Sequence, residues 1–377
     1  MNSLKLCVVI CLIVTLPITA PSVQQKPYAV VTEVKDGVKT ITNPDFPRDG
    51  RFIAKLKEEM SCGGEGSPEA ALLNKPLRLE VDAPGNVYVM DYGDVNIKVY
   101  DGQGKFLRAI GRQGQGPGEF GGMVEFKMMT AGRIGILDFS QSRVSIMTTE
   151  GRYVSGFPLE GFFAMLAIDG RDRLFLAKRA AIKEPDKLST DFQEIPYVTS
   201  IFRTDAAGKV LGHLVDLLGE SMVMKASGGG GVVGMGGLYM IVWNVSREGK
   251  LYGGFNLDYT VGVYGEDGNK EFAFGREFTP VKNVRFKGMV GQKKAMPAYR
   301  NIVIGEAGNI WIELIQPENT KGFLYDVFSP DGIYTKQVSV EQRIGVFKNG
   351  KVYSLLRPEE GYASIKRYGM ELVPSGK

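Results

Sequence analysis

The sequence is nearly without histidine and poor in cysteine. Among 377 residues there are one histidine and three cysteines. One imidazole cannot build a multi-histidine metal cage or a site that uses several histidines for proton transfer. The one histidine, His213, follows Gly212 at the end of an expected strand, and we expect it at an edge or on the surface. Cys7 and Cys11 lie in the leader described next, so only Cys62 remains and no intramolecular disulfide is expected.

Long apolar runs are also lacking, apart from one near the start of the chain. Leu6–Ile18 follows the single charge of Lys5, and the small residues Ala20 and Ser22 come after it. A positive charge, a short apolar run and a small-residue cleavage site are typical of a secretory signal peptide. We expect removal of residues 1–22, a periplasmic or secreted protein and no membrane span thereafter. A leader that is kept as an anchor is the alternative.

Charge of one sign is not in large excess. The net charge is +4, with 46 basic and 42 acidic residues. This mild balance argues against nucleic acid as a partner. We expect instead a small molecule, a peptide or a protein as the partner of a monomeric chain.

What the sequence has in abundance is glycine, together with β-forming residues. Gly occurs 49 times and hydrophobic residues make up 44% of the chain. This mixture is typical of many short strands joined by tight turns. It predicts an all-β fold with a substantial core.

A pair of turns recurs along the chain, and such repeats decide the architecture. In four of the repeated units each turn contains a glycine, and the second glycine follows the first by 19 residues, as in Gly85 and Gly104. In the third and fifth units the two turns are farther apart, which predicts insertions between the second and third strands of those units. The six predicted blades lie near residues 75–111, 122–158, 163–215, 237–276, 298–339 and 343–374. The first turns are at Gly85, Gly132, Asp172, Gly249, Gly308 and Gly350, and the second turns at Gly104, Gly151, Gly208, Gly268, Gly332 and Gly369.

These units predict a six-bladed β-propeller of four-stranded antiparallel blades. Each unit exposes apolar residues on both faces, so the copies must stack around an axis to bury them. We expect the propeller over residues 75–377 and an N-terminal extension over residues 23–74. Within the extension, Tyr28–Asn43 predicts a hairpin, one strand of which adds to the outer edge of the last blade. Arg51–Met60 predicts a short helix, from apolar residues at helical spacing.

One segment carries a resemblance to a known family. Gly111–Phe120 reads GRQGQGPGEF, with Val87–Asp91 before it and Arg143–Ile146 after it. These segments resemble the NHL-repeat six-bladed propellers, which alternate a Gly-rich, Phe-ended connection with a strand ending in Asp. Blades one and two match well, and blades three to six match only in turn spacing. The resemblance implies the fold but not the chemistry, because that family includes lyases, lactone hydrolases and binding modules.

Oxygen ligands for calcium are present but not clustered in any loop. Glu80, Asn244 and Glu306 lie on or just after innermost strands, and they are the alternative metal-ligating set. They would serve a calcium-dependent hydrolase or lyase of the lactonase type. Asp91 and Asp138 end second strands at equivalent positions, and we expect them to accept backbone hydrogen bonds at the turns.

The candidate ligand site lies where the chain enters the innermost strands. The predicted ligand-binding residues are Arg78, Phe163, Tyr239, Arg300 and Arg343. Cations beside aromatic rings at a channel mouth suit an anionic or aromatic small molecule or a peptide. The alternative is that carboxylates such as Glu341 and Glu306 pair with the arginines structurally. We therefore expect a binding or interaction propeller with no catalytic residues and no cofactor, with calcium-dependent catalysis as the rival hypothesis.

Overall fold

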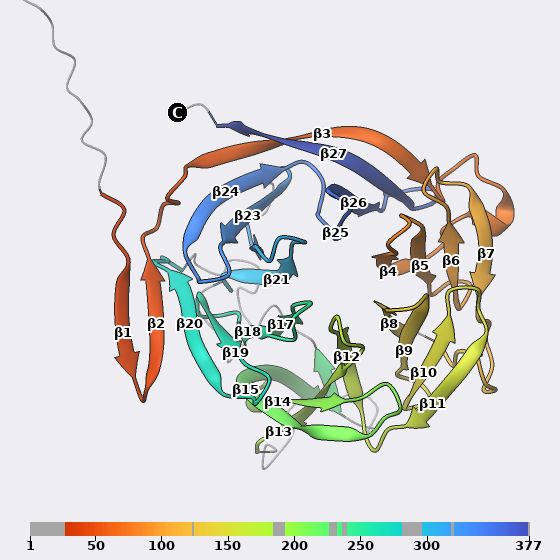
Figure 1. Cartoon of the computed structure of the whole chain (residues 1–377), viewed down its shortest axis with the longest axis horizontal. Coiled ribbons are helices and arrows are strands. Elements are labelled where there is room, and N and C mark those ends of the chain that lie inside the picture. The colour runs from red at the N-terminus through yellow and green to blue at the C-terminus, as the bar shows by residue number, and fades with distance from the viewer. Residues whose placement is uncertain are drawn as a thin grey trace, which may run out of the picture.

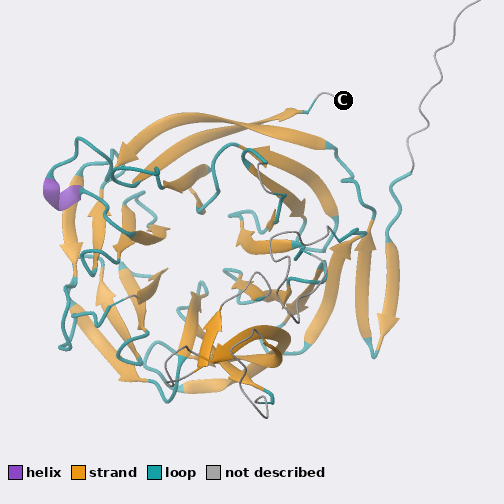
Figure 2. Ribbon diagram, turned by 180° about the vertical axis from the view of Figure 1, so that it is seen from behind, coloured by secondary structure: helices purple, strands orange, loops and turns teal. Residues whose placement is uncertain are grey.

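The fold is a six-bladed β-propeller. The computed structural model describes residues 27–122, 124–183, 193–225, 232–235, 240–280, 296–317 and 320–375. Its blades surround a central axis, and the inner strand of each blade faces that axis (Figure 1). Among the described residues, the one helical element is the single turn η1 (Glu69–Ala71), coloured purple in Figure 2. The predicted fold class is confirmed.

The first three blades follow the predicted spacing. Blade one consists of β4 (Pro76–Val81), β5 (Val87–Asp91), β6 (Asn96–Tyr100) and β7 (Phe106–Ile110). Blade two consists of β8 (Val124–Met129), β9 (Arg133–Asp138), β10 (Arg143–Thr148) and β11 (Tyr153–Pro158). Blade three consists of β12 (Phe163–Ile168), β13 (Leu174–Ala181), β14 (Gln193–Thr204), β15 (Val210–Lys225) and a fifth strand, β16 (Val232–Met235).

The last three blades are extended by strands from the N-terminal region. Blade four consists of β17 (Ile241–Val245), β18 (Leu251–Phe255), β19 (Thr260–Tyr264) and β20 (Lys270–Arg276). Blade five consists of β21 (Tyr299–Ile304), β22 (Ile310–Leu314), β23 (Phe323–Phe328) and β24 (Tyr334–Val340). Blade six consists of β25 (Val346–Lys348), β26 (Lys351–Leu356), β27 (Ser364–Pro374) and, as its outer strand, β3 (Arg51–Cys62).

Burial of both faces of each blade builds the core between neighbouring blades. All five residues of β5 are buried, and their side chains alternate in direction. Val87 and Val89 pack in a cluster with Tyr353 of blade six. Tyr88 and Met90 pack in another cluster with residues of blade two. A blade alone would expose one of these faces to water, so the blades stabilise one another.

The outer strand β3 closes the ring. It pairs antiparallel with β27 over ten residue pairs and parallel with β24 over four, which joins blades five and six in one sheet. Figure 1 shows β3 and β27 side by side along the rim. The predicted helix over Arg51–Met60 is therefore wrong. Phe52, Leu56 and Met60 recur every four residues, which fits a strand of period two as well as a helix.

The closure also corrects the predicted turn at Gly369. This residue lies within β27, opposite Lys57 of β3, and not between two strands of blade six. Its offset of 19 residues from Gly350 matches the other blades without marking a turn. The fourth strand of blade six comes from the N-terminal extension instead.

The N-terminal hairpin is confirmed, but its predicted position is wrong. β1 (Val31–Lys35) and β2 (Val38–Asn43) pair antiparallel, and β2 pairs parallel with β20. The hairpin thus extends blade four and not the last blade (Figure 1). Asn43 fixes this position, because its side chain is fully buried and donates to the carbonyls of Gly275 and Gly332.

Carboxylates at the ends of second strands hold the loops that enter the blades. The buried Asp91 accepts hydrogen bonds from the backbone N–H groups of Asn74, Lys75 and Gly93 at 2.8–3.0 Å. Asp138 accepts in the same way from Gly121 and two residues of its own turn. The predicted structural role of these two aspartates is confirmed.

The leader lies outside the described residues, so its predicted removal remains a prediction. Within the part of the chain that the structure describes, no helix has the length and hydrophobicity needed to cross a membrane.

Removing β3 should abolish the folded ring, whereas removing β1 should not. A chain that begins at Gly63 lacks the strand between β24 and β27, and we expect it to show no cooperative thermal unfolding by circular dichroism. A chain that begins at Val38 is the control, because all five residues of β1 are exposed. It loses the β1–β2 ladder and the Tyr28 hydrogen bonds but keeps β2 and β3, so its thermal unfolding should stay cooperative at a lower midpoint. Equal stability of the two chains would contradict closure by β3.

Cys62 should be unreactive in the folded protein. It is a free cysteine, buried on β3, and burial raises the pKa of its thiol to about 12. At pH 8 roughly one molecule in ten thousand then carries the reactive thiolate. We expect a chain that begins at Val23 to release no chromophore from a disulfide reagent until denaturant is added, and then one equivalent. Fast reaction in the native state would contradict this burial.

Candidate functional site

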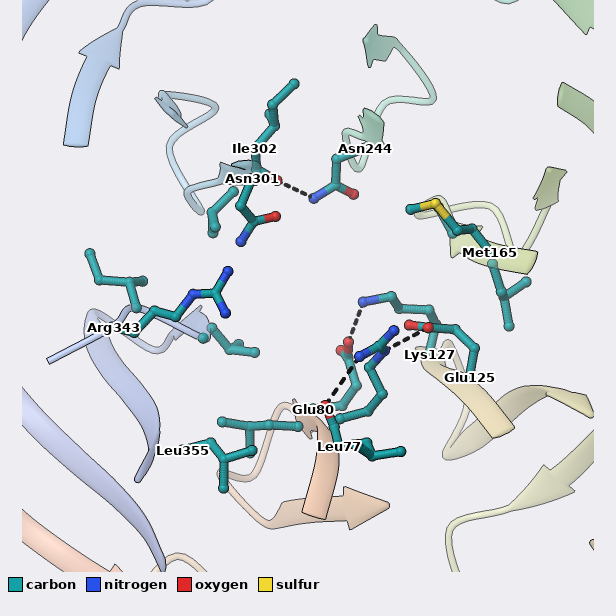
Figure 3. A pocket seen from close by; sticks show the side chains of 18 of the residues that line it. Leu77, Glu80, Glu125, Lys127, Met165, Asn244, Asn301, Ile302, Arg343 and Leu355 are labelled. Atoms are coloured by element: carbon teal, nitrogen blue, oxygen red, sulfur yellow. Dashed lines mark hydrogen bonds and ion pairs between the residues drawn. The ribbon is translucent and has the colours of Figure 1, made fainter. Parts of the chain in front are cut away.

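A cavity of about 360 Å³ lies on the propeller axis. The inner strands β4, β8, β12, β17 and β21 line it, together with the segment that leads into β25 and the end of β26. Figure 3 shows side chains from these elements converging on the channel. The strands meet here because each blade begins at the axis, so residues far apart in the sequence share one opening.

Two ion pairs in the channel join blades one and two. The cation comes from β4 in one pair and from β8 in the other. Arg78 of β4 donates through Nε to Glu125 of β8 at 2.6 Å. Two residues farther along each strand, Lys127 of β8 lies 2.5 Å from Glu80 of β4. Residues two apart on a strand face the same side, so the patterns Arg-x-Glu and Glu-x-Lys match when the two strands lie beside each other. Figure 3 shows Glu80, Glu125 and Lys127 grouped on this side.

A third carboxylate joins blades five and six. Glu313 lies on β22 with a side chain that is 1% exposed. Arg343, just before β25, donates through Nε to this carboxylate at 2.8 Å, and Arg300 of β21 lies 3.5 Å from its other oxygen. Glu341 and Glu306, the carboxylates named as alternative partners of the arginines, form no described ion pair with them. Glu341 is exposed, and Glu306 accepts a hydrogen bond from the backbone of Gly350.

Arg357 differs from the other cations of the channel. It follows β26 and donates through Nη2 to the carbonyl of Pro76 at 2.7 Å. Partial burial and the nearby guanidiniums of Arg343 and Arg78 lower its pKa. Among the lining cations that the structure describes, Arg357 alone has no carboxylate within ion-pair distance.

The channel mouth therefore carries a positive excess. Its cations are Arg78, Lys127, Arg300, Arg343 and Arg357, and the carboxylates that pair with them are Glu80, Glu125 and Glu313. Five positive charges face three negative ones in this described part of the channel. The side chains of the predicted arginines are 40–49% exposed, so they can still reach a solute.

The predicted site residues are only partly brought together. Arg78, Arg300 and Arg343 line one cavity, as expected for inner strands of neighbouring blades. Phe163 does not line it, because its ring packs against Phe202 with a centroid separation of 6.1 Å. Tyr239 lies outside the described residues. The apolar side of the cavity is instead formed in part by Met165, which is labelled in Figure 3.

The alternative metal-ligating residues are not arranged as a set. Glu80 and Asn244 line the cavity, but Glu306 does not. The side chain of Asn244 donates to the carbonyl of Ile302 and accepts from its neighbour Val245. In the part of the chain that the structure describes, no three His, Cys, Asp or Glu side chains group closely enough to hold a metal ion.

Sequence reasoning missed four charged residues of this site. Glu125 and Lys127 follow the pattern that complements Arg78 and Glu80, and this opposite order could have revealed them. Glu313 is a charged residue within the apolar strand Ile310–Leu314, which is itself a signal of a buried ion pair. Arg357 follows a strand with no pattern that distinguishes it from any exposed arginine.

Comparisons with known proteins agree on the fold. The DUF5128 family, described as a 6-bladed beta-propeller, matches residues 68–165. No curated protein matches the sequence. A Bacteroides fragilis protein named as exported is similar in structure, with 12% identity, a TM-score of 0.51 and coverage of 86% of this chain and 96% of its own.

Two further solved structures are similar. A DUF4221 member from Bacteroides vulgatus has 12% identity, a TM-score of 0.55 and coverage of 86% of this chain and 99% of its own. Virginiamycin B lyase from Staphylococcus aureus has 10% identity, a TM-score of 0.40 and coverage of 84% and 99%. At these identities the two Bacteroides structures indicate the propeller fold alone.

Replacing Glu313 should destabilise the junction of blades five and six. Glu313→Gln removes the charge that Arg300 and Arg343 share, and leaves two guanidiniums close together. We expect a loss of about 1–3 kcal/mol in the free energy of unfolding by urea. Glu341→Gln is the matched control, because Glu341 is exposed in the same region and should change stability by less than about 0.5 kcal/mol. Equal effects of the two substitutions would contradict the role of Glu313.

Proposed function

We propose that this protein is an exported binding propeller whose channel mouth takes an anionic small molecule or peptide. The observation that carries the proposal is the positive excess at the entry face, with Arg357 unpaired among the described residues. A guanidinium in a partly desolvated site favours a carboxylate or phosphate, which it can bind with two parallel hydrogen bonds.

The ion pairs of the channel support binding rather than oppose it. Glu125 and Glu313 hold Arg78 and Arg343 through Nε, so their orientation is fixed before any ligand arrives. A preorganised site loses less side-chain entropy on binding than a flexible one. The carboxylates also lower the repulsion among the arginines without cancelling the excess charge.

The place of the histidine favours binding over proton-transfer catalysis. His213 lies on β15, near the outer side of blade three, and its ring is 2.8 Å from Asp216. An imidazole on an outer strand is remote from the axial cavity. The proposed function therefore assigns no catalytic residue.

Features of the leader and of one neighbour support export. The apolar run with Lys5, Ala20 and Ser22 has the form of a signal peptide, and the Bacteroides fragilis neighbour is named as exported.

The loop Gly111–Phe120 supports a relationship to the NHL-repeat propellers. Three backbone carbonyls of this loop accept hydrogen bonds from Arg143, which fixes the connection between blades one and two.

Binding of small anions should depend on Arg78. We expect inorganic phosphate or benzoate to bind in calorimetric titrations at low ionic strength and to bind more weakly as salt is added. Arg78→Gln should weaken binding by about 1.5–3 kcal/mol, because it removes a charge-assisted contact. Circular dichroism should show that the variant is folded.

Arg152→Gln is the matched control for the same titrations. Arg152 is an exposed arginine in the turn between β10 and β11, on the face opposite the strand entries. This substitution should leave affinity unchanged. If neither phosphate nor benzoate binds, the proposed function is wrong. Stoichiometric calcium in elemental analysis of the purified protein would also contradict it.

A further inference from the structure

Two side cavities adjoin the axial cavity at Arg357. The first side cavity, of about 370 Å³, lies between blades six and one and is lined by Pro76, Leu77, Tyr92 and Pro358 among others. The second side cavity, of about 400 Å³, lies between blades five and six and is lined by Phe323, Leu355, Pro358 and Tyr362 among others. Arg357 lines the axial cavity and both side cavities.

The side cavities are apolar spaces with a positive rim. Tyr92 and Tyr362 are 45% and 40% exposed, so their rings are accessible to a ligand that enters these cavities. Lys75, Arg343 and Arg357 are the charged residues that line them, and no described aspartate or glutamate does so. Such a surface favours a ligand that carries a negative group next to apolar groups.

We infer that the ligand is a peptide with a free C-terminal carboxylate, and that Arg357 is the residue that binds this carboxylate. This inference rests on the proposed function and names its ligand class. A C-terminal residue carries its carboxylate and its side chain on one carbon atom. With the carboxylate at Arg357, that side chain lies within reach of an apolar side cavity.

The state of Arg357 explains why it, more than the predicted arginines, makes the main contact with the carboxylate. Arg78 and Arg343 already direct Nε to buried carboxylates, and Arg357 has only the carbonyl of Pro76. Burial and, beyond it, repulsion from the guanidiniums of Arg343 and Arg78 disfavour the charge on Arg357 and lower its pKa. A carboxylate placed among the three relieves this repulsion, so binding gains from all of them.

The adjacent cavities favour a peptide over a small acid. Two apolar spaces separated by Pro358 can take the side chains of successive or alternate residues of an extended chain. The exposed rings of Tyr92 and Tyr362 offer contact area at low cost in side-chain entropy. A small acid would occupy one of these spaces and leave the other open.

The test uses hexapeptides of one sequence that end in Leu or Asp, each with a free or an amidated C-terminus. We expect the free Leu peptide to bind to the full chain in fluorescence anisotropy, and amidation or Asp at the end to weaken it at least roughly tenfold. Arg357→Gln should weaken binding of the free Leu peptide to a similar extent, and Arg357→Lys less so. Arg152→Gln should leave its affinity unchanged.

A second pair of variants separates the peptide from a simple anion. Tyr92→Ser and Tyr362→Ser should weaken binding of the Leu peptide and leave binding of inorganic phosphate unchanged. If phosphate or benzoate binds but the peptides do not, or if amidation has no effect, the peptide inference is wrong and the proposed function stands. If no anion binds at all, the proposed function fails with it. Unchanged thermal stability of the variants shows that lost affinity is not lost folding.

Discussion

The pairing of β3 with both β24 and β27 is the interaction on which the closed ring depends. A propeller is a circle of sheets, and a chain must join its first and last parts noncovalently to complete it. Here one strand from before blade one completes blade six and contacts blade five as well. Cys62, the one cysteine among the described residues, is a free and buried thiol, so a backbone ladder and not a disulfide joins these strands.

Closure also determines which charged groups meet in the channel. Because blade six is completed by β3, its inner segment and its loop lie between blades five and one. Arg343 and Arg357 are thereby placed beside Arg78, although these residues are far apart in the sequence. In the same way, the packing of blade one beside blade two sets Arg78 and Glu80 of β4 against Glu125 and Lys127 of β8. The site is thus a consequence of strand order around the ring.

The sequence was sufficient for the fold because the turns repeat, and insufficient where a pattern fitted two structures. Gly85 and Gly104 mark real turns, whereas Gly369 lies within a long strand at the same offset. In Arg51–Cys62, most apolar residues lie at alternate positions, as in a strand. Phe52, Leu56 and Met60 are also four residues apart, which is close to the spacing of one face of a helix. The cation cluster was predicted from positions at strand starts. Its partners were not, since the contact of Glu313 with Arg343 depends on the angle between two blades.

Paired charges in the channel act on geometry more than on stability. An ion pair between a buried carboxylate and a half-exposed guanidinium has a desolvation cost that offsets much of its Coulomb energy. What such a pair retains is direction, since Nε of Arg78 points to Glu125 and Nε of Arg343 to Glu313. Nη1 of Arg78 donates to the carbonyl of Leu77, and the other outer nitrogen atoms of the two guanidiniums have no described hydrogen bond and lie in the same cavity as Arg357. The same contacts therefore join neighbouring blades and orient the guanidiniums that we propose to bind an anion.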